Sequence, residues 1–544
     1  MADPAPTDPP KRDATAGIVA AALLLGASNL LSRVLGFGRD WLINYEFGAT
    51  GQTDVYQASF TLPDFINYLL AGGALSVSLL PRMAQLYAKP NDQPGGMTAD
   101  RAFSIVCTAM MAAAAVLVAI ALLGAEPFIR FWFDGFTPQQ VAQTAHLTRI
   151  ILPAQLFFLV GGLFQAALLA RQQFRALALT PLLYNGGIIV GGVVGGKLGQ
   201  IEGFSWGALV GALLGGLLVP VLAARKVVSF RPVWAPMHPE IKRFLWIAAP
   251  LMIGVSLTTI DEWLAKHYGA SLQPGTISWM MTARRVMLVP VGLLGAAAGQ
   301  ATGAFLARLH AEGDRVQMAA VLARTMGATV GLSLLLAAVL SALAEPTVRM
   351  LFAYGRFGEA DVRQAAGALQ LLAWAVPVWG AQQVLARAFY AVGDTWRPMI
   401  ATTLVTVLML PAYDRAAQWR GHEIAGLCLA AVVGIALQVI ALSLLARRTL
   451  GFDIALFVRA VAPAAAIALV GGSGASAMDA WLGASVQASA GDFGLPALAA
   501  RAARLGVSSA PWLGAVVLAG ATIGLPGLPA RVARMLQRRA KKAA

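Results

Sequence analysis

The chain has 544 residues, of which 58% are hydrophobic and 12% are charged. Soluble proteins are about half apolar and carry about a quarter charged residues, so this composition excludes an ordinary soluble enzyme. The formal net charge of +15 would suit a nucleic-acid-binding protein, but we find no basic face with supporting aromatic residues and exclude nucleic acid as a partner.

Apolar stretches long enough to cross a membrane recur along the whole chain. A helix of about 20 residues rises about 30 Å, which is the thickness of the hydrocarbon core of a bilayer. Hydropathy therefore predicts an all-α polytopic membrane protein with fourteen transmembrane helices. Their centres lie near residues 25, 67, 114, 158, 188, 213, 253, 288, 332, 375, 405, 433, 467 and 517.

The distribution of Lys and Arg predicts the orientation of these helices. With the N-terminus in the cytoplasm, Lys and Arg are about twice as frequent in the cytoplasmic loops as in the outer loops. One missed span would interchange all later loops and remove this excess. We therefore expect both termini in the cytoplasm, with a basic tail from Arg531 to Lys542 that is attracted to anionic membrane lipids.

An internal repeat relates two halves of the chain. The pattern A-E-P-x-x-R-x-x-F begins at Ala125 and again at Ala344. Each copy holds six predicted spans, an even number, so the halves have the same orientation, as in transporters built from parallel repeats. Further matches follow in order at a spacing of about 220 residues: Pro153 with Pro377, 169–174 with 385–390, and Pro181 with Pro398.

The spans and the repeat predict five parts. A cytoplasmic N-terminal segment covers 1–16, an N-lobe of helices 1–6 covers 17–230, and a C-lobe of helices 7–12 covers 231–450. Helices 13 and 14 cover 451–526, and the basic cytoplasmic tail covers 527–544. In such a fold we expect a site between the two lobes.

Charged side chains inside a span are costly, by about 2.5 to 3.5 kcal/mol, and usually face a polar cavity or a partner. Arg33 interrupts the first span, and Arg39 and Asp40 follow within two turns. Two interpretations stay open. The arginines face one cavity, or Arg39 and Asp40 form an interfacial pair while Arg33 extends to the membrane surface.

Arg284 and Arg285 lie about ten residues into the eighth span, roughly 15 Å deep. Adjacent helical residues point about 100° apart, so we expect one arginine to face a cavity and the other to bind a carboxylate or reach a neighbouring helix. Structural ion pairing without a ligand is the alternative. An arginine-lined cavity suits a lipid phosphate, because guanidinium binds phosphate through two parallel hydrogen bonds. Candidate partners for these cations are Asp54, Asp64, Asp261 and Glu262.

Prolines and glycines mark places where helices bend or pack. Pro63, Pro290 and the pair Gly72-Gly73 either loosen the second and eighth spans, as alternating access requires, or serve ordinary packing. We expect tight helix packing at three glycine pairs, namely 186–187, 191–192 and 195–196.

Motifs of ATP-driven transporters, metalloproteases and hydrolases are absent from the sequence. We therefore expect a transporter without catalytic residues or a cofactor. The two cysteines, Cys107 and Cys428, give no pattern for a thiolate metal site. Any other metal site stays open, as does coupling to membrane potential, sodium or protons.

The segment 32–40, S-R-V-L-G-F-G-R-D, resembles the first-helix signature of the MurJ (MviN) lipid II flippase family. This family belongs to the multidrug/oligosaccharidyl-lipid/polysaccharide (MOP) exporter superfamily. Thr53-Asp54 with Leu62-Pro63 resembles its second-helix elements, and residues 278–285 resemble its eighth-helix signature. The resemblance extends at least from the first span through Pro398.

The resemblance implies two six-helix lobes followed by two helices that line a lipid groove. It also implies movement of lipid II, the undecaprenyl-linked peptidoglycan precursor, from the inner to the outer leaflet of the bacterial inner membrane. Arg33, Arg39 and Arg285 would hold the pyrophosphate and sugar headgroup, and Asp40 and Asp54 would arrange these arginines. Cell-wall synthesis enzymes are the implied protein partners. Arg284, Asp261 and Glu262 are accessory candidates without a family role.

One departure from the family pattern affects the predicted site. Where the family has an arginine pair after Leu-Pro and then Ala-Glu-Gly, this chain has Asn67-Tyr68 and 71–73 as Ala-Gly-Gly. Our hypothesis is that Arg284 replaces the missing positive charge. The alternatives are a flippase or exporter of another polyprenyl-linked glycan or small molecule, a membrane-embedded lipid-modifying enzyme, and a noncatalytic scaffold.

Overall fold

The computed structural model describes residues 11–71, 79–88, 97–253, 257–483 and 495–522. Helices and short turns make up these residues, and no strand occurs among them. The chain forms two compact units. Unit 1 comprises Met1–Ile43, Ser59–Phe131 and Pro138–Ile253, and unit 2 comprises Asn44–Ala58, Trp132–Thr137 and Gly254–Ala544.

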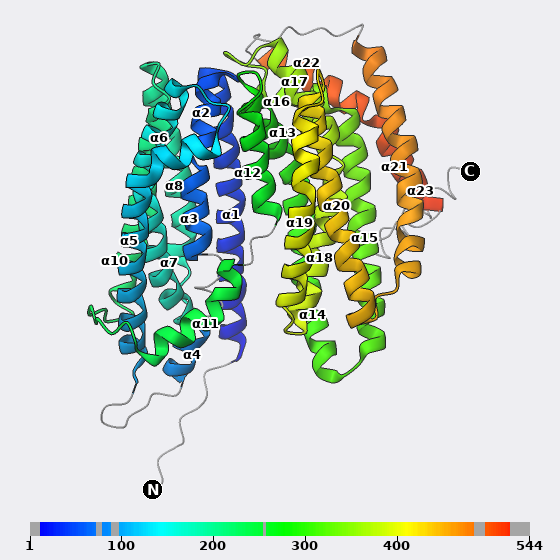
Figure 1. Ribbon diagram of the computed structural model, residues 1–544. Helices are drawn as coiled ribbons and strands as arrows, with labels where there is room; N and C mark the ends of the chain where they lie inside the picture. The colour runs from blue at the N-terminus through cyan, green and yellow to red at the C-terminus, as the bar shows by residue number, and fades with distance from the viewer. Residues whose placement is uncertain (1–10, 72–78, 89–96, 254–256, 484–494, 523–544) are drawn as a thin grey trace. The chain divides into compact units, whose positions relative to one another are not determined.

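Unit 1 holds most of the long first helix, α1 (Lys11–Phe47), and the helices from α3 (Thr61–Ala71) to α11 (Pro239–Ile253) (Figure 1). Its core lies between α5, α7 and α10, where Phe103 packs edge-on against Phe164 with ring centroids 5.1 Å apart. The other helices are α3 (Thr61–Ala71), α4 (Leu80–Ala88), α5 (Ala99–Trp132), α6 (Pro138–Ile151), α7 (Pro153–Ala170), α8 (Arg175–Lys197), α9 (Glu202–Gly211), the π-helical η2 (Ala212–Leu218), α10 (Val219–Ala224) and α11 (Pro239–Ile253).

Glycines let α8 and α9 pack with their backbones nearly in contact. A Cβ atom added to Gly187 would lie 2.7 Å from the carbonyl oxygen of Gly207, and one added to Gly191 would lie 2.3 Å from that of Gly203. Small residues four apart on both helices allow this approach. The predicted tight packing is confirmed at these positions, whereas Gly186 faces open space.

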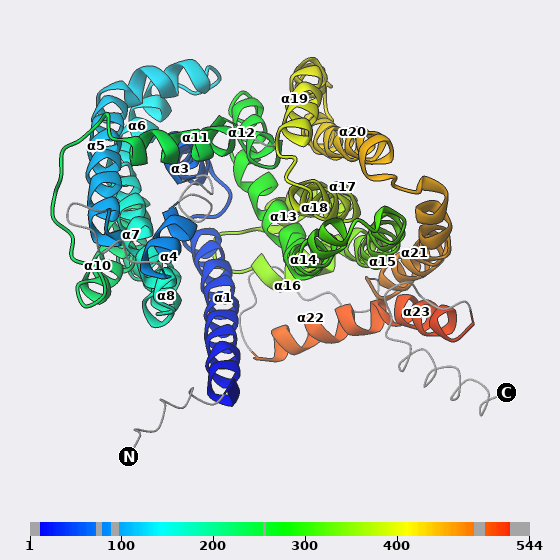
Figure 2. The ribbon, with the colours of Figure 1, turned by 90° about the horizontal axis from the view of Figure 1, so that it is seen from below.

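Unit 2 contains the short α2 (Gly51–Ser59) except Ser59, together with the helices from α12 onwards (Figure 2). They are α12 (Leu257–Gly269), α13 (Thr276–Pro290), the π-helical η3 (Val291–Gly295), α14 (Ala296–Glu312), α15 (Arg315–Ala342), α16 (Ala344–Phe352), α17 (Glu359–Leu372), α18 (Ala375–Ala391), α19 (Trp396–Ala417), α20 (Glu423–Leu450), α21 (Ile454–Gly483), α22 (Leu495–Ser508) and α23 (Ala510–Thr522).

Seven helical segments among the described residues are long and apolar enough to cross a membrane. They confirm an all-α membrane protein with several spans, whereas the count of fourteen and the predicted lobe boundaries stay predictions. The segments are Ala99–Trp132, Pro138–Ala170, Arg175–Lys197, Glu202–Ala224, Arg315–Ala342, Glu423–Leu450 and Ile454–Leu482.

The two prolines expected to loosen helices have different surroundings. Pro290 ends α13 and is followed directly by η3, where the α-helical hydrogen-bond pattern widens. Proline has no amide hydrogen to donate, so it interrupts the α-helical hydrogen bonds, and a π-helical turn follows it. Pro63 lies in the first turn of α3, where proline is tolerated. Gly72-Gly73 and the basic tail from Arg531 to Lys542 lie outside the described residues.

Both copies of the repeated A-E-P-x-x-R pattern form the same local ion pair. Arg130 lies 3.0 Å from Glu126 in α5, and Arg349 lies 2.8 Å from Glu345 in α16. Each pair joins residues four apart, which are neighbours on a helix surface. This shared detail supports the internal repeat that the sequence predicts.

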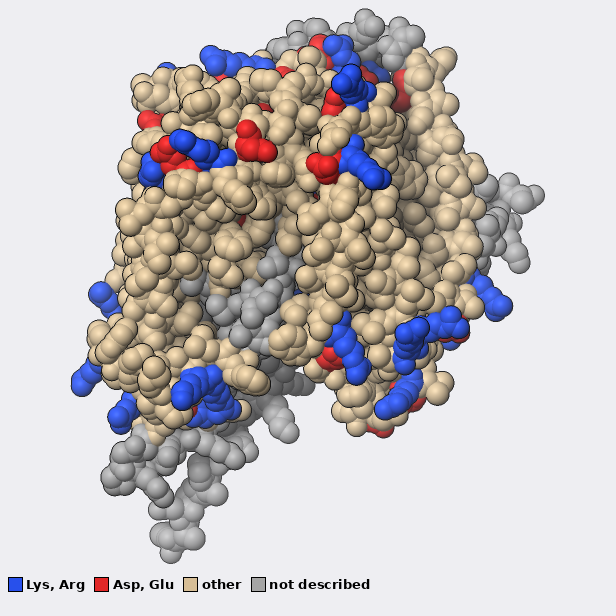
Figure 3. Space-filling view, viewed as in Figure 1, with Lys and Arg blue, Asp and Glu red and all other residues tan. Residues whose placement is uncertain are grey.

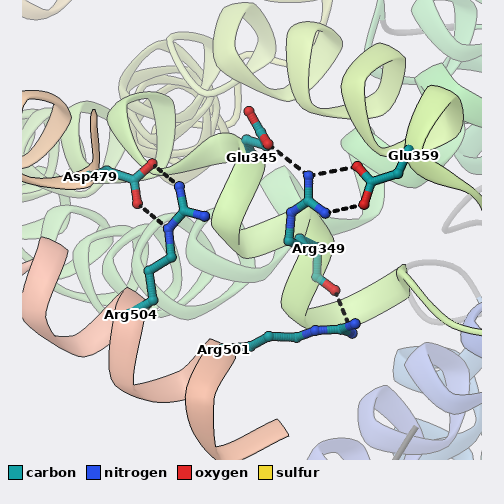
Figure 4. Close-up of polar contacts among 6 residues, drawn as sticks. All are labelled: Glu345, Arg349, Glu359, Asp479, Arg501 and Arg504. Carbon is teal, nitrogen blue, oxygen red and sulfur yellow. Dashed lines mark hydrogen bonds and ion pairs between the residues drawn. The ribbon is translucent and has the colours of Figure 1, made fainter. Parts of the chain in front are cut away.

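Two arginines dock α22 onto its neighbours within unit 2 (Figure 4). Buried Arg501 donates hydrogen bonds to the carbonyl oxygens of Arg349 at 3.4 Å and Ala353 at 3.1 Å. Arg504 binds Asp479 of α21 through two bonds of 2.9 and 3.0 Å. The charged side chains of α22 therefore point towards protein.

Next to the contact between α22 and α16, Arg349 forms ion pairs with two glutamates, Glu345 and Glu359. Hydrogen bonds from the Arg349 guanidinium to Glu359 raise the pKa of that guanidinium above its ordinary value, and a hydrogen bond to Glu345 adds to this effect. The side chain of Arg349 thus binds two carboxylates, while its backbone carbonyl accepts from Arg501. This arrangement holds the end of α16 next to α22.

Candidate functional site

The Thr53-Asp54 motif lies against the N-terminus of α13. The Asp54 carboxylate accepts hydrogen bonds from the backbone amides of Gly275 at 2.6 Å and Ser278 at 2.8 Å, and from the Ser278 hydroxyl at 2.8 Å. The first amides of a helix lack partners within the helix, and its N-terminus attracts negative charge. The Thr53-Asp54 element and the eighth-helix motif therefore meet in unit 2.

Gly275 permits this docking. Its φ of 96° lies in the left-handed region that side chains disfavour, and an added Cβ atom would lie 2.6 Å from the carbonyl oxygen of Ala49. The Ser278 hydroxyl also lies 2.8 Å from the Thr53 hydroxyl. Asp54 thus caps the helix that carries the two predicted arginines, instead of contacting a guanidinium.

Arg284 is buried in unit 2 and pairs with a buried acid. Its guanidinium donates a hydrogen bond to Asp261 of α12, and the Tyr413 hydroxyl of α19 donates to the other oxygen of that carboxylate. The guanidinium also lies 5.7 Å from the centre of the Trp379 ring. A buried charge of this kind needs its partner, because removing one member leaves the other charge uncompensated.

A second pair lies beside the first. Lys266 is 1% exposed, and its amine lies 2.9 Å from Glu262. Glu262 also lies 4.0 Å from the Nε atom of Arg284. The accessory residues Asp261, Glu262 and Arg284 therefore form one charged network between α12, α13 and α19.

Arg285, in contrast, is exposed on α13. The expectation that the two adjacent arginines diverge is confirmed, with Arg284 as the one that binds a carboxylate. The pairing of Arg284 with Asp261 favours a structural role for Arg284. That Arg284 replaces the cation missing near Asn67 stays a hypothesis.

The first-helix residues lie in unit 1. Arg39 donates to Asp40 from Nε at 3.0 Å and from Nη2 at 2.8 Å, and Arg33 is exposed. The predicted Arg39–Asp40 contact is present. Since Asp54 and Arg285 belong to unit 2, a joint site formed by the five residues stays a prediction.

Three residues outside α13 help to position it and were not identified from the sequence: Tyr413, Asn44 and Asp361. Tyr413 binds Asp261, Asn44 donates to Thr282 at 3.2 Å, and the Trp279 indole donates to Asp361 at 2.8 Å. Tyr413 stands at the end of an apolar stretch, directly before Asp414, and no sequence pattern links it to Asp261.

The part of the chain that the structure describes contains no group of three or more His, Cys, Asp or Glu residues able to hold a metal ion. The charged network at Arg284 contains two acids and two cations. Its arrangement is suited to holding helices together.

The sequence of this chain matches a known protein family. A family profile described as lipid II flippase MurJ matches residues 43–489. The match covers most of the chain and includes Asp54, Asp261 and Arg285. The chain belongs to the lipid II flippase MurJ family.

Individual relatives agree with this assignment. The lipid II flippase MurJ of Burkholderia cenocepacia is 28% identical over 402 residues, which cover 72% of this chain and 77% of the relative. The probable lipid II flippase MurJ of Haemophilus influenzae is 26% identical, with coverage of 68% and 75%. The family consists of transporters and not of enzymes, and lipid II connects it with peptidoglycan synthesis.

Solved structures show the same fold. A lipid II flippase MurJ in an inward closed conformation superposes with a TM-score of 0.73 at 20% identity and covers 91% of this chain and 98% of its own. An inward-facing multidrug resistance MATE transporter of the MOP superfamily gives a TM-score of 0.64 at 15% identity, with coverage of 78% and 95%. This chain therefore shares the fold of these two transporters.

Proposed function

We propose that this flippase moves lipid II from the inner to the outer leaflet of the bacterial inner membrane. The family assignment supports the activity. The observation that supports a direct role for Arg285 is its exposure on α13, beside an arginine that already has a buried carboxylate partner. Arg285 is thus the exposed member of the pair, the one that an anionic headgroup can reach.

The residues of α13 have separate tasks in this proposal. Arg285 binds a phosphate oxygen pair of the headgroup, for which the guanidinium geometry is suited. Arg284 positions the helix through Asp261, and Asp54 positions it through the amides of Gly275 and Ser278. The substrate-binding residue is therefore supported by two independent anchors.

Arg33 and Arg39 complete the proposed headgroup site from the first helix, and Asp40 orients Arg39. Transport follows by alternating access, in which two lobes rock about an arginine-lined cavity. We place both termini in the cytoplasm, because Lys and Arg are concentrated in the loops on that side. Lipid II and the surrounding lipids are the binding partners, and cell-wall synthesis enzymes are candidate protein partners.

Reconstitution tests this proposal. The purified chain in vesicles should translocate lipid II, and Arg285→Ala should lose most of the activity at an unchanged folded yield. Arg324→Ala is a matched control, because Arg324 is also an exposed arginine of unit 2. Equal activity of wild type and Arg285→Ala would contradict the assigned role of Arg285.

The departure from the family pattern at Asn67-Tyr68 favours a second candidate, transport of another polyprenyl-pyrophosphate glycan. The same vesicles distinguish the candidates when lipid II competes with undecaprenyl pyrophosphate carrying a different sugar. Stronger inhibition by the second lipid, together with no lipid II translocation, would support this candidate.

A further inference from the structure

A cavity of about 720 Å³ opens at one end of unit 2 and includes no residue of α13. The turns from α14 to α15, from α18 to α19 and from α20 to α21 form its walls. Figure 3 shows Lys and Arg side chains gathered at this lower end of the unit. We call this space the inner-end cavity, because the charge distribution predicts that these turns face the cytoplasm.

Three arginines line the inner-end cavity. Arg397 lies 3.4 Å from Asp394, whereas Arg315 and Arg448 form no ion pair with the residues that the structure describes. All three side chains are exposed. Two guanidinium groups from different turns are therefore available to one anion.

The two acids of the cavity are bound to backbone amides. Asp394 accepts from the amide of Arg397 at 3.2 Å, and Asp453 accepts from the amide of Leu456 at 3.0 Å. Each carboxylate lies at the N-terminus of a helix, α19 or α21, whose positive end offsets its charge. These acids leave Arg315 and Arg448 unneutralised.

The floor of the cavity is apolar. Met318 and Leu450 are buried there, and Val392 and Leu456 are half-buried. An inorganic anion gains nothing from such a wall. A lipid headgroup brings a phosphate together with glycerol and the first methylenes of its acyl chains, which match the basic rim and the apolar floor.

The position of the cavity along the helices also fits a lipid. Three candidate spans end at it, since Arg315–Ala342 begins there, Glu423–Leu450 ends there, and Ile454–Leu482 begins a few residues later. The ends of spans lie at the level of the lipid headgroups. Basic pockets between helices on the cytoplasmic side are suited to acidic headgroups.

We propose that the inner-end cavity binds the phosphate group of an anionic lipid of the inner leaflet, through Arg315 and Arg448. The site is separate from the proposed lipid II site. Its occupant would tie together the three helix turns that form it, so bound lipid stabilises unit 2.

Native mass spectrometry of the full-length protein, titrated with phosphatidylglycerol, tests this proposal. Arg315→Gln with Arg448→Gln should weaken binding by about fivefold for each arginine removed. Arg447→Gln with Arg459→Gln is the matched control, because both arginines are exposed near the same end and neither lines the cavity. The control should change binding by less than about twofold.

Two results would overturn the proposal. Equal weakening in the two double variants would mean that diffuse surface charge attracts the lipid. Displacement of phosphatidylglycerol by millimolar inorganic phosphate would assign the cavity to a soluble anion instead. All four arginines are exposed, so both double variants should fold, and an unchanged elution volume and melting temperature in lipid-free detergent verify this.

Discussion

Arg284 and Arg285 are adjacent in α13, yet Arg284 is buried against Asp261 and Arg285 is exposed. The helix turns by about 100° per residue, so the two guanidinium groups leave it in different directions. One cation therefore stabilises the protein, and the proposal assigns the exposed one to the ligand. The predictions below separate these roles.

We expect Arg284→Ala to destabilise the protein by about 3 to 5 kcal/mol, because it leaves the Asp261 carboxylate buried without its cation. The double variant Arg284→Met with Asp261→Asn should recover much of this loss. Thermal unfolding in detergent measures both changes. If the double variant is less stable than Arg284→Ala, the pair has a role other than mutual neutralisation.

Replacement of Asp54 distinguishes a helix cap from an arginine partner. Asp54→Ala should cost about 1 kcal/mol or more, since it removes the acceptor for the amides of Gly275 and Ser278. Asp54→Asn keeps an acceptor oxygen and should lose less. Hydrogen exchange at residues 275–278 reports the cap, and equal exchange in the two variants would argue against it.

The contact between α8 and α9 provides a matched pair of glycine substitutions. Gly187→Ala should destabilise by about 1 to 3 kcal/mol, because the new methyl group would meet the backbone of α9. Gly186→Ala meets open space and should be neutral or stabilising. Comparison of melting temperatures tests this, and a similar loss at both positions would contradict the packing described here.

Arg501 should hold the middle of α22 against the end of α16. In Arg501→Ala, the carbonyls of Arg349 and Ala353 lose their donor and the Tyr354 ring loses a cation 4.7 Å from its centre. We expect faster hydrogen exchange in α22 while α15 and α20 stay unchanged. Uniformly faster exchange across unit 2 would mean that Arg501 supports the whole unit.

Sequence periodicity predicted the features that depend on one helix. The divergence of Arg284 from Arg285 follows from the helical repeat, and the close packing at Gly187 and Gly191 follows from small residues at regular spacing. That the chain contains membrane-spanning helices follows from hydropathy alone. These properties require no knowledge of neighbouring helices.

The particular side-chain contacts between helices could not be predicted. Asp54 binds backbone amides of α13, which have no signature in the sequence. The partner of Asp261 at Tyr413 is 152 residues away along the chain. Arg501 and Arg504 both point towards protein, and no sequence pattern links them to Ala353 or Asp479.

Translocation of lipid II by the purified chain in vesicles tests the proposed function of this flippase. Wild type should move lipid II between leaflets, and Arg324→Ala should leave the rate unchanged. Arg285→Ala should reduce the rate by at least about tenfold, which corresponds to the loss of one charged hydrogen-bonded contact. Wild-type vesicles that bind lipid II without moving it, or an Arg285→Ala variant as fast as wild type, would contradict the proposal.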